Sequence, residues 1–264
     1  GVITQPDKPQ KRGNKILESS VSKISLKYDF PVFKPTNLND PEFIKDIEDI
    51  EFDFLVVAAY GKIIPNWLLH APGKIPVNVH YSILPSYRGA SPIQASLLNG
   101  DNLSGVTFME MSEGLDEGKI IKIFTLDIIK THNKVSLEKD LCNLAIKNID
   151  NVLDLLFADK ILLNAQDDTK ASYCSKIKKS DSVIDFVEKA DVIINKYRAY
   201  SEWPGLAFIH KDVLVKIHDM HLCHEDLSGM PGTIVKFDKT GIYFKTKLGT
   251  IVITHLQLPN KNKI

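Results

Sequence analysis

A short segment of the chain places an amide and an imidazole two residues apart, and a carboxylate follows in a turn. Asn78 and His80 occupy alternate positions of an apolar segment, and Asp116 lies in the glycine-containing turn Glu113–Gly118. Alternate residues of a strand point to the same face, so Asn78 and His80 are expected side by side. Such a trio can hold a carbonyl group, stabilise negative charge on its oxygen and move a proton. We therefore predict a catalytic site.

Each member of this trio also has a structural interpretation. Asn78 and His80 could be hydrogen-bonded ends of a core strand, and Asp116 could be an ordinary turn residue. The neighbouring segments Ser82–Pro85 and Arg88–Gly89 favour the functional interpretation. The arginine could bind a substrate carboxylate or phosphate, or it could equally tie down its own loop.

The elements that must position the trio alternate between strand and helix. Apolar runs predict strands at 53–59, 75–80, 105–111 and 119–128. Apolar spacing and end signals predict helices at 40–51 and 91–100, and a long helix that closes the first domain near residue 159. This alternation is typical of an α/β fold with a doubly wound, mostly parallel sheet.

We expect three segments along the chain. Residues 1–159 form the catalytic domain, which starts within a strand and is expected to lack its first strand–helix unit, so that the chain is part of a longer enzyme. Residues 160–178 are polar and lysine-rich, as linkers are. Residues 179–264 begin with a helix predicted at 181–200, and short strands with glycine turns then predict a small, OB-like β-barrel.

Composition bounds the class of protein. The 264 residues are 44% hydrophobic and 25% charged, with a net charge of zero, so global charge gives no sign of nucleic-acid binding. No apolar run reaches the roughly 18 residues that a membrane span requires.

The cysteines Cys142, Cys174 and Cys223 have no paired spacing, which indicates reduced thiols in a cytosolic protein. His218, His221 and His224 lack a second ligand pair, so no metal site is predicted.

Four short motifs together resemble the signature of the folate-dependent formyltransferases. They are Asn78-Val79-His80, Ser82-Ile83-Leu84-Pro85, Arg88-Gly89-Ala90 and Gly114-Leu115-Asp116. Within that family, Thr4–Pro9, Arg12–Gly13 and Trp203–Gly205 resemble the members that act on initiator methionyl-tRNA. The resemblance runs through nearly the whole chain, with the motifs in the family's order.

The resemblance implies the reaction and its setting. A formyl group would pass from 10-formyltetrahydrofolate to the α-amine of methionine on initiator methionyl-tRNA, for translation initiation, in a monomeric cytoplasmic enzyme of bacterial or organellar origin that needs no metal. His80 would stabilise the oxyanion, Asn78 would donate to it or hold the amine, and Asp116 would orient the imidazole and accept the proton.

The resemblance also implies the binding residues. Those for the folate donor are Ser82, Ile83, Leu84, Pro85, Tyr60, Gly61 and Ile63, and those for the tRNA are Lys8, Lys11, Arg12 and Lys15. Tyr81 departs from the family, which carries a small residue there; its phenol could narrow the nucleotide entrance, stack on the terminal adenine or face outwards.

Two other functions stay open at this point. A small-molecule formyltransferase, acting on a glycinamide ribonucleotide or an amino sugar, would use the same trio. A non-catalytic RNA-binding remnant is the second alternative, because the first strand–helix unit is expected to be missing. Arg198 could contact RNA or could serve the junction between helix and barrel.

Overall fold

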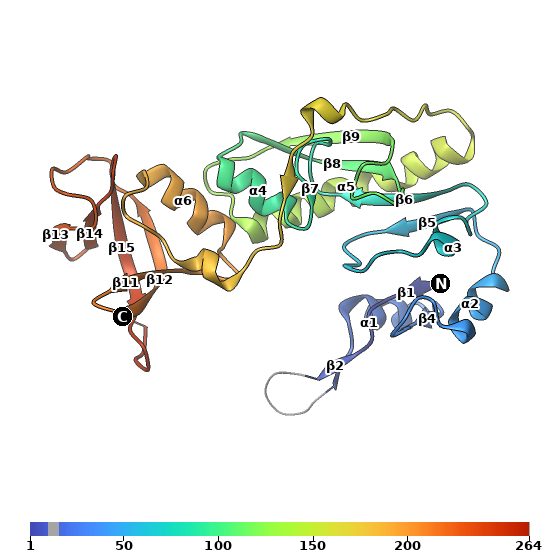
Figure 1. The fold of residues 1–264 in the computed structure, drawn as a ribbon, viewed down its shortest axis with the longest axis horizontal. Coiled ribbons are helices and arrows are strands. Elements are labelled where there is room, and N and C mark those ends of the chain that lie inside the picture. The colour runs from blue at the N-terminus through green and yellow to red at the C-terminus, as the bar shows by residue number, and fades with distance from the viewer. Residues whose placement is uncertain (10–15, 264) are drawn as a thin grey trace. The chain divides into compact units, whose positions relative to one another are not determined.

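The computed structural model describes residues 1–9 and 16–263 and divides the chain into two compact units (Figure 1). The first unit contains Gly1–His80, Phe108–Ile121 and Leu153–Asn164. The second contains Tyr81–Thr107, Lys122–Val152 and Ala165–Ile264. Among the helices of the described ranges, none combines the length and the apolar character that crossing a bilayer requires.

The central sheet has four strands in the order β5-β6-β8-β9. They are β5 (Phe54–Val57), β6 (Ile75–His80), β8 (Leu103–Glu110) and β9 (Ile120–Asp127). β5 and β6 run parallel, and Val57 lies opposite Asn78. The sheet and the helices between its strands confirm the predicted α/β class, and the strands agree with the apolar runs of the sequence to within a few residues.

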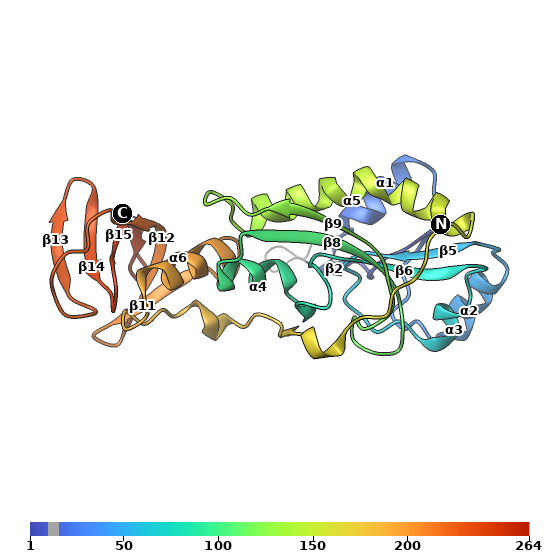
Figure 2. The same cartoon turned by 90° about the horizontal axis from the view of Figure 1, so that it is seen from above.

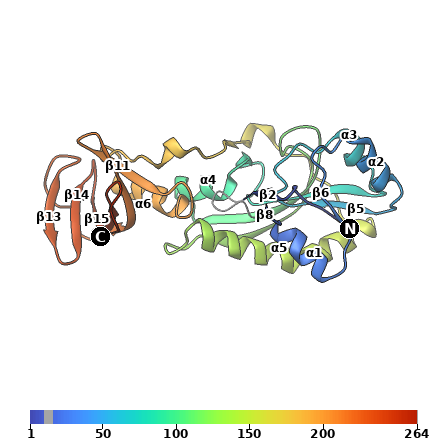
Figure 3. The same ribbon diagram turned by 90° about the horizontal axis from the view of Figure 1, so that it is seen from below.

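Two helices cover opposite faces of β8 and β9, as Figures 2 and 3 show from two sides. α5 (Lys134–Phe157) packs through an apolar stripe that includes the fully buried Leu137 and Leu141. α4 (Pro92–Asn99) begins with proline and ends at Gly100, whose positive φ of 70° permits a left-handed cap. Ser91 occupies the N-cap position, but its side chain makes no capping bond.

The N-terminal part of the first unit contains short elements around a small core. β1 (Val2–Ile3) pairs in parallel with β4 (Val32–Phe33), and β2 (Lys8–Pro9) pairs antiparallel with β3 (Ile16–Leu17). The helices are α1 (Ser20–Lys27), α2 (Pro41–Glu48) and α3 (Asn66–Leu69). Asp40 caps α2 by accepting a hydrogen bond from the Glu42 amide, which confirms the helix predicted at 40–51. The core consists of Leu38, Phe43, Ile47 and Leu68.

The C-terminal part of the second unit is an antiparallel sheet in the order β11-β12-β15-β14-β13. Its strands are β11 (Leu206–His210), β12 (Val213–Leu222), β13 (Ile234–Asp238), β14 (Gly241–Lys245) and β15 (Thr250–Gln257). Phe186 stacks on Phe244 with ring centroids 4.9 Å apart, and Phe208 packs against both rings. The predicted β-rich segment is confirmed, whereas its closure into a barrel stays a prediction.

The helix predicted at 181–200 is wrong in its first half. α6 spans only Ala190–Ala199, and a 3-10 turn, η2 (Lys179–Ser182), lies before it. Between them, Val183 forms a bridge with Ala207 and the amide of Ile184 donates to the Ala207 carbonyl at 2.9 Å, and residues 186–188 form a turn. Pairing with the edge strand β11 therefore outweighs the local helical preference of this segment.

Packing of α5 gives a stability prediction. Leu141→Ala removes a fully buried side chain and should lower the free energy of unfolding by about 2–5 kcal/mol through lost burial and a residual cavity. Ile146→Ala, on the exposed face of the same helix, is the matched control and should change it by less than about 0.5 kcal/mol. Urea unfolding of both variants measures the difference; equal losses would contradict the assigned core face.

Candidate active site

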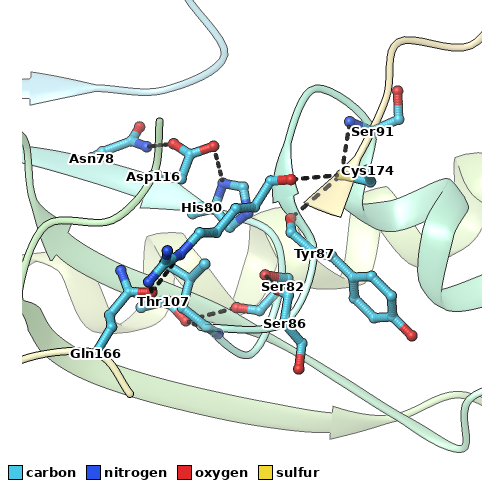
Figure 4. Close-up of polar contacts among 12 residues, drawn as sticks. Asn78, His80, Ser82, Ser86, Tyr87, Ser91, Thr107, Asp116, Gln166 and Cys174 are labelled. Atoms are coloured by element: carbon cyan, nitrogen blue, oxygen red, sulfur yellow. Dashed lines mark hydrogen bonds and ion pairs between the residues drawn. The ribbon is translucent and has the colours of Figure 1, made fainter. Parts of the chain in front are cut away.

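The carboxylate of Asp116 lies between the side chains of Asn78 and His80 (Figure 4). The amide Nδ2 of Asn78 donates to Asp116 Oδ1 at 3.3 Å, and His80 Nδ1 is 3.7 Å from Asp116 Oδ2. The second distance is that of an ion pair rather than of a short hydrogen bond. All three residues belong to the first unit. The structure thus brings the predicted trio together, and its catalytic role stays a prediction.

Two local features place these side chains. Val77 and Val79 are buried in β6, so the alternating residues Asn78 and His80 share the other face at the strand's carboxyl end. The loop that carries Asp116 is closed at its base by the hydrogen bond from the Glu110 amide to the Lys119 carbonyl. A hydrogen bond from the Met111 amide to the Pro76 carbonyl, at 2.9 Å, fixes the start of that loop to β6.

Burial makes the trio suited to handling charge. The side chain of His80 is 6% exposed and that of Asp116 is 17% exposed. Charges that are partly withdrawn from water interact more strongly than charges on the surface. A carboxylate beside an imidazole fixes the orientation of the ring. The arrangement can therefore present an N–H donor to a developing negative charge and keep a base next to it.

The predicted donor loop, Ser82–Pro85, belongs to the second unit and is shaped by Thr107. The hydroxyl of this fully buried threonine donates to the Ser82 carbonyl at 2.6 Å and accepts from the Leu84 amide at 3.2 Å. The Ser82 hydroxyl in turn donates to the Ser86 carbonyl at 2.6 Å. Ser82 and Leu84 are buried, so a ligand can meet this loop through Ile83, Pro85 and the backbone.

The other predicted donor residues follow β5 in the first unit. Gly61 has a φ of +74°, and open space surrounds the position that a Cβ would take, so a ligand can approach its backbone. Ile63 is 93% exposed. The side chain of Tyr60 packs against the small core, burial raises the pKa of its phenol, and its carbonyl accepts a hydrogen bond from Gln5 Nε2 at 2.9 Å.

The predicted tRNA contacts lie in or next to the undescribed segment. Lys11, Arg12 and Lys15 lie outside the described residues. Lys8 pairs through its backbone with Leu17 in the β2–β3 ladder. Their role in binding RNA stays a prediction.

Tyr81 packs against α5. The thiol of Cys142 and the carboxylate of Glu138 lie close to its phenol. Burial, then the Cys142 thiol and then Glu138 raise the pKa of the Tyr81 phenol. The phenol thus contacts α5 inside the second unit, and its effect on the nucleotide entrance stays a prediction.

Arg198 and His218 have internal partners. Arg198 donates to the carbonyls of His132 at 2.7 Å and Ile129 at 3.0 Å, which favours the structural alternative for this residue. His218 Nε2 lies 3.0 Å from Gln257 Oε1. Within residues 1–9 and 16–263, no three His, Cys, Asp or Glu side chains converge in a group that could hold a metal ion.

Comparison with known proteins identifies the class. The family model for the formyl transferase domain matches residues 1–153, and the model for the formyl transferase C-terminal domain matches residues 176–264. A solved structure of WlaRD, a sugar 3N-formyl transferase, in the presence of dTDP and 5-N-formyl-THF, shares the fold. Its TM-score is 0.69 at 20% sequence identity, over 98% of this chain and 88% of that chain. The fold and the two matched domains are those of a formyl transferase.

Curated relatives show to which family of formyl transferases the chain belongs. The methionyl-tRNA formyltransferase of Sulfurihydrogenibium sp. (strain YO3AOP1) is 38% identical over 100% of this chain and 86% of its own length. That of Finegoldia magna is 39% identical over 100% of this chain and 84% of its own length. The chain belongs to the methionyl-tRNA formyltransferase family.

The position of Tyr81 gives a prediction for the variant Tyr81→Phe. Because the phenol lies beside Cys142 and Glu138 of α5, loss of its hydroxyl should lower the free energy of unfolding by at most about 1 kcal/mol and leave the KM for the acceptor within about twofold of wild type. Steady-state kinetics and urea unfolding check both parts. A large rise in the acceptor KM with unchanged stability would place the phenol against the substrate instead.

Proposed function

We propose that this protein transfers the formyl group of 10-formyltetrahydrofolate to the α-amine of methionine on initiator methionyl-tRNA. The observation that carries the proposal is the convergence of Asn78, His80 and Asp116 in a chain of this family. The names of the relatives at 38% and 39% identity support methionyl-tRNA as the acceptor. The 5-N-formyl-THF in the WlaRD structure supports a folate donor.

The reaction makes and breaks one carbon–nitrogen bond. The lone pair of the α-amine forms a bond to the formyl carbon, and negative charge develops on the formyl oxygen. The bond between that carbon and N10 of the folate then breaks. The amine loses one proton and N10 gains one, so the overall transfer needs no oxidant or reductant.

Each member of the trio has a role that follows from its geometry. In the proposal, the imidazole of His80 donates an N–H to the formyl oxygen as its charge develops. Asp116, 3.7 Å from the ring, keeps the imidazole oriented. The same carboxylate accepts the proton that the amine loses, directly or through a water molecule.

Asn78 completes the arrangement. Its Nδ2 donates to Asp116 at 3.3 Å, which fixes the orientation of the amide. The amide oxygen is then available to hold the attacking amine, and the second amide hydrogen can support the oxyanion. The effect is to reduce the entropy lost when amine and formyl carbon meet in the reactive orientation.

The substrates would bind through the predicted segments. Ser82–Pro85 and Tyr60, Gly61 and Ile63 would contact the donor, and Lys8, Lys11, Arg12 and Lys15 would contact the acceptor RNA. Lysine amines suit phosphate groups, and the planar guanidinium of Arg12 suits bases or paired phosphates. We also propose that the enzyme is a cytoplasmic monomer, organised as a catalytic domain (1–159), a linker (160–178) and a tRNA-binding domain (179–264).

The trio is tested by His80→Ala with a radiolabelled formyl donor and charged initiator tRNA. Loss of the oxyanion donor should lower kcat by about 100- to 1,000-fold, while the affinity for the tRNA stays within about twofold of wild type. The matched control is His70→Ala, which removes an exposed histidine at the end of α3 in the same unit and should leave kcat unchanged.

The acceptor is tested with the same donor and the wild-type protein. Labelled formyl groups should appear on initiator methionyl-tRNA and not on a dTDP-linked amino sugar. Transfer to the sugar alone would make this chain a small-molecule formyltransferase. Tight RNA binding without any transfer would support the non-catalytic alternative. Normal turnover of His80→Ala would show that the imidazole has another role.

A further inference from the structure

The linker predicted at 160–178 is attached along the donor loop. β10 (Tyr173–Cys174) pairs in parallel with β7 (Arg88–Gly89). The Arg88 amide donates to the Ser172 carbonyl at 2.8 Å, and the Ser172 amide donates to the Pro85 carbonyl at 3.2 Å. Figure 4 shows Cys174 beside Tyr87 and Ser91 at this junction. The segment therefore belongs to the framework of the donor loop and is not a free connection.

The side chain of Arg88 is the centre of this attachment. It is 1% exposed, which makes it the largest fully buried side chain of the described residues. Nε and Nη2 both donate to Gln166 Oε1, at 3.0 and 2.8 Å. Nη2 also donates to Asp168 Oδ1 at 2.7 Å, and Nη1 donates to the Tyr173 hydroxyl at 3.3 Å. Three linker side chains thus converge on one guanidinium.

Electrostatics explains why this position requires arginine. Burial lowers the pKa of Arg88, but the hydrogen bonds and charge interactions with Asp168 and Tyr173 together outweigh burial and leave the pKa raised. A buried charge is tolerated only where partners replace its lost hydration. A lysine would offer one compact charge instead of a planar fork and could not reach all of these acceptors in the same geometry.

We propose that Arg88 is a positioning residue for the folate donor. It contacts no substrate; it holds the linker segment 166–174 against Ser82–Pro85, so that the loop keeps the shape in which it meets the donor. The linker also leads to the C-terminal sheet. Donor binding is therefore coupled to the order of the linker. The inference rests on the proposed function for the identity of the donor.

The first test is steady-state kinetics of Arg88→Lys in the full chain. The KM for 10-formyltetrahydrofolate should rise about tenfold, which corresponds to about 1.4 kcal/mol, while kcat falls less than about threefold and the acceptor KM is unchanged. The control is Arg198→Lys, which alters a guanidinium bonded to the Ile129 and His132 carbonyls in the same unit. It should leave the donor KM unchanged.

A second test follows the linker directly. Hydrogen exchange of amides 166–174 should slow about tenfold when tetrahydrofolate binds the wild-type protein, and should not slow in Arg88→Lys. Gln166→Leu leaves Arg88 in place and should reproduce the same defect. In a double-mutant cycle, the combined Arg88→Lys and Gln166→Leu variant should raise the donor KM no further than either change alone. The reason is that both changes break the same contact, between Arg88 and Gln166.

The outcomes separate this inference from the proposed function. Absence of formyl transfer by the wild-type protein would reject the function, while the exchange experiment would still test the attachment. An unchanged donor KM together with unchanged protection in both variants would overturn the positioning role. A rise confined to the acceptor KM, with a weaker salt dependence of RNA binding, would assign Arg88 to a phosphate and would also overturn it.

Discussion

The candidate site depends on one constraint, namely that successive side chains of β6 point to opposite faces of the strand. Val77 and Val79 are buried, so Asn78 and His80 are held on the opposite face of the strand. A register shift of one residue would turn the amide and the imidazole into the space where the valines pack and displace the valines from it, at a large cost in hydrophobic burial. The register that the core requires is therefore also the register that the proposed chemistry requires. Asp116 then needs only a short loop, fixed to β6 through Met111 and Pro76, to reach both polar groups.

The donor loop follows a different rule, because buried polar groups give it its shape. Thr107 is hydrogen-bonded to the Ser82 carbonyl and the Leu84 amide. Just beyond the loop, Arg88 is hydrogen-bonded to linker residues such as Asp168. A buried hydrogen bond that is lost leaves an unsatisfied partner and costs more than an exposed one. Such a loop has few alternative conformations, which limits the ordering that a ligand must impose when it binds.

Elements that depend on local apolar spacing and end signals can be predicted from the sequence. Elements that depend on contacts with residues far away along the chain cannot. The strands of the central sheet and the helices α2, α4 and α5 follow from apolar spacing and end signals, and the trio follows from one motif and one turn. Local spacing predicts a helix that includes Val183 and Ile184, because their pairing with Ala207 is not visible in that spacing. The composition of 160–178 likewise predicts only a polar linker. Its contacts with Arg88 are not visible locally, because Gln166, Asp168 and Tyr173 lie 78, 80 and 85 residues from Arg88 along the chain. For Thr107 a signal existed, namely a hydroxyl within the apolar run Gly105–Met109.

The distribution of arginine bears on how a chain of zero net charge could hold RNA. Only Arg12, Arg88 and Arg198 are arginines, while lysines are abundant. Arg88 and Arg198 both bond carbonyl, amide or carboxylate oxygens of their own chain, where several directed donors are needed at once. In the proposed reaction, the described part of the chain would then meet phosphates through lysine, whose flexible point charge attracts RNA without reading it. Arg12 would then be the arginine that recognises the RNA through the directed hydrogen bonds of its guanidinium. General attraction and specific recognition would thus be assigned to different residue types, because the framework of the fold already uses the other two arginines.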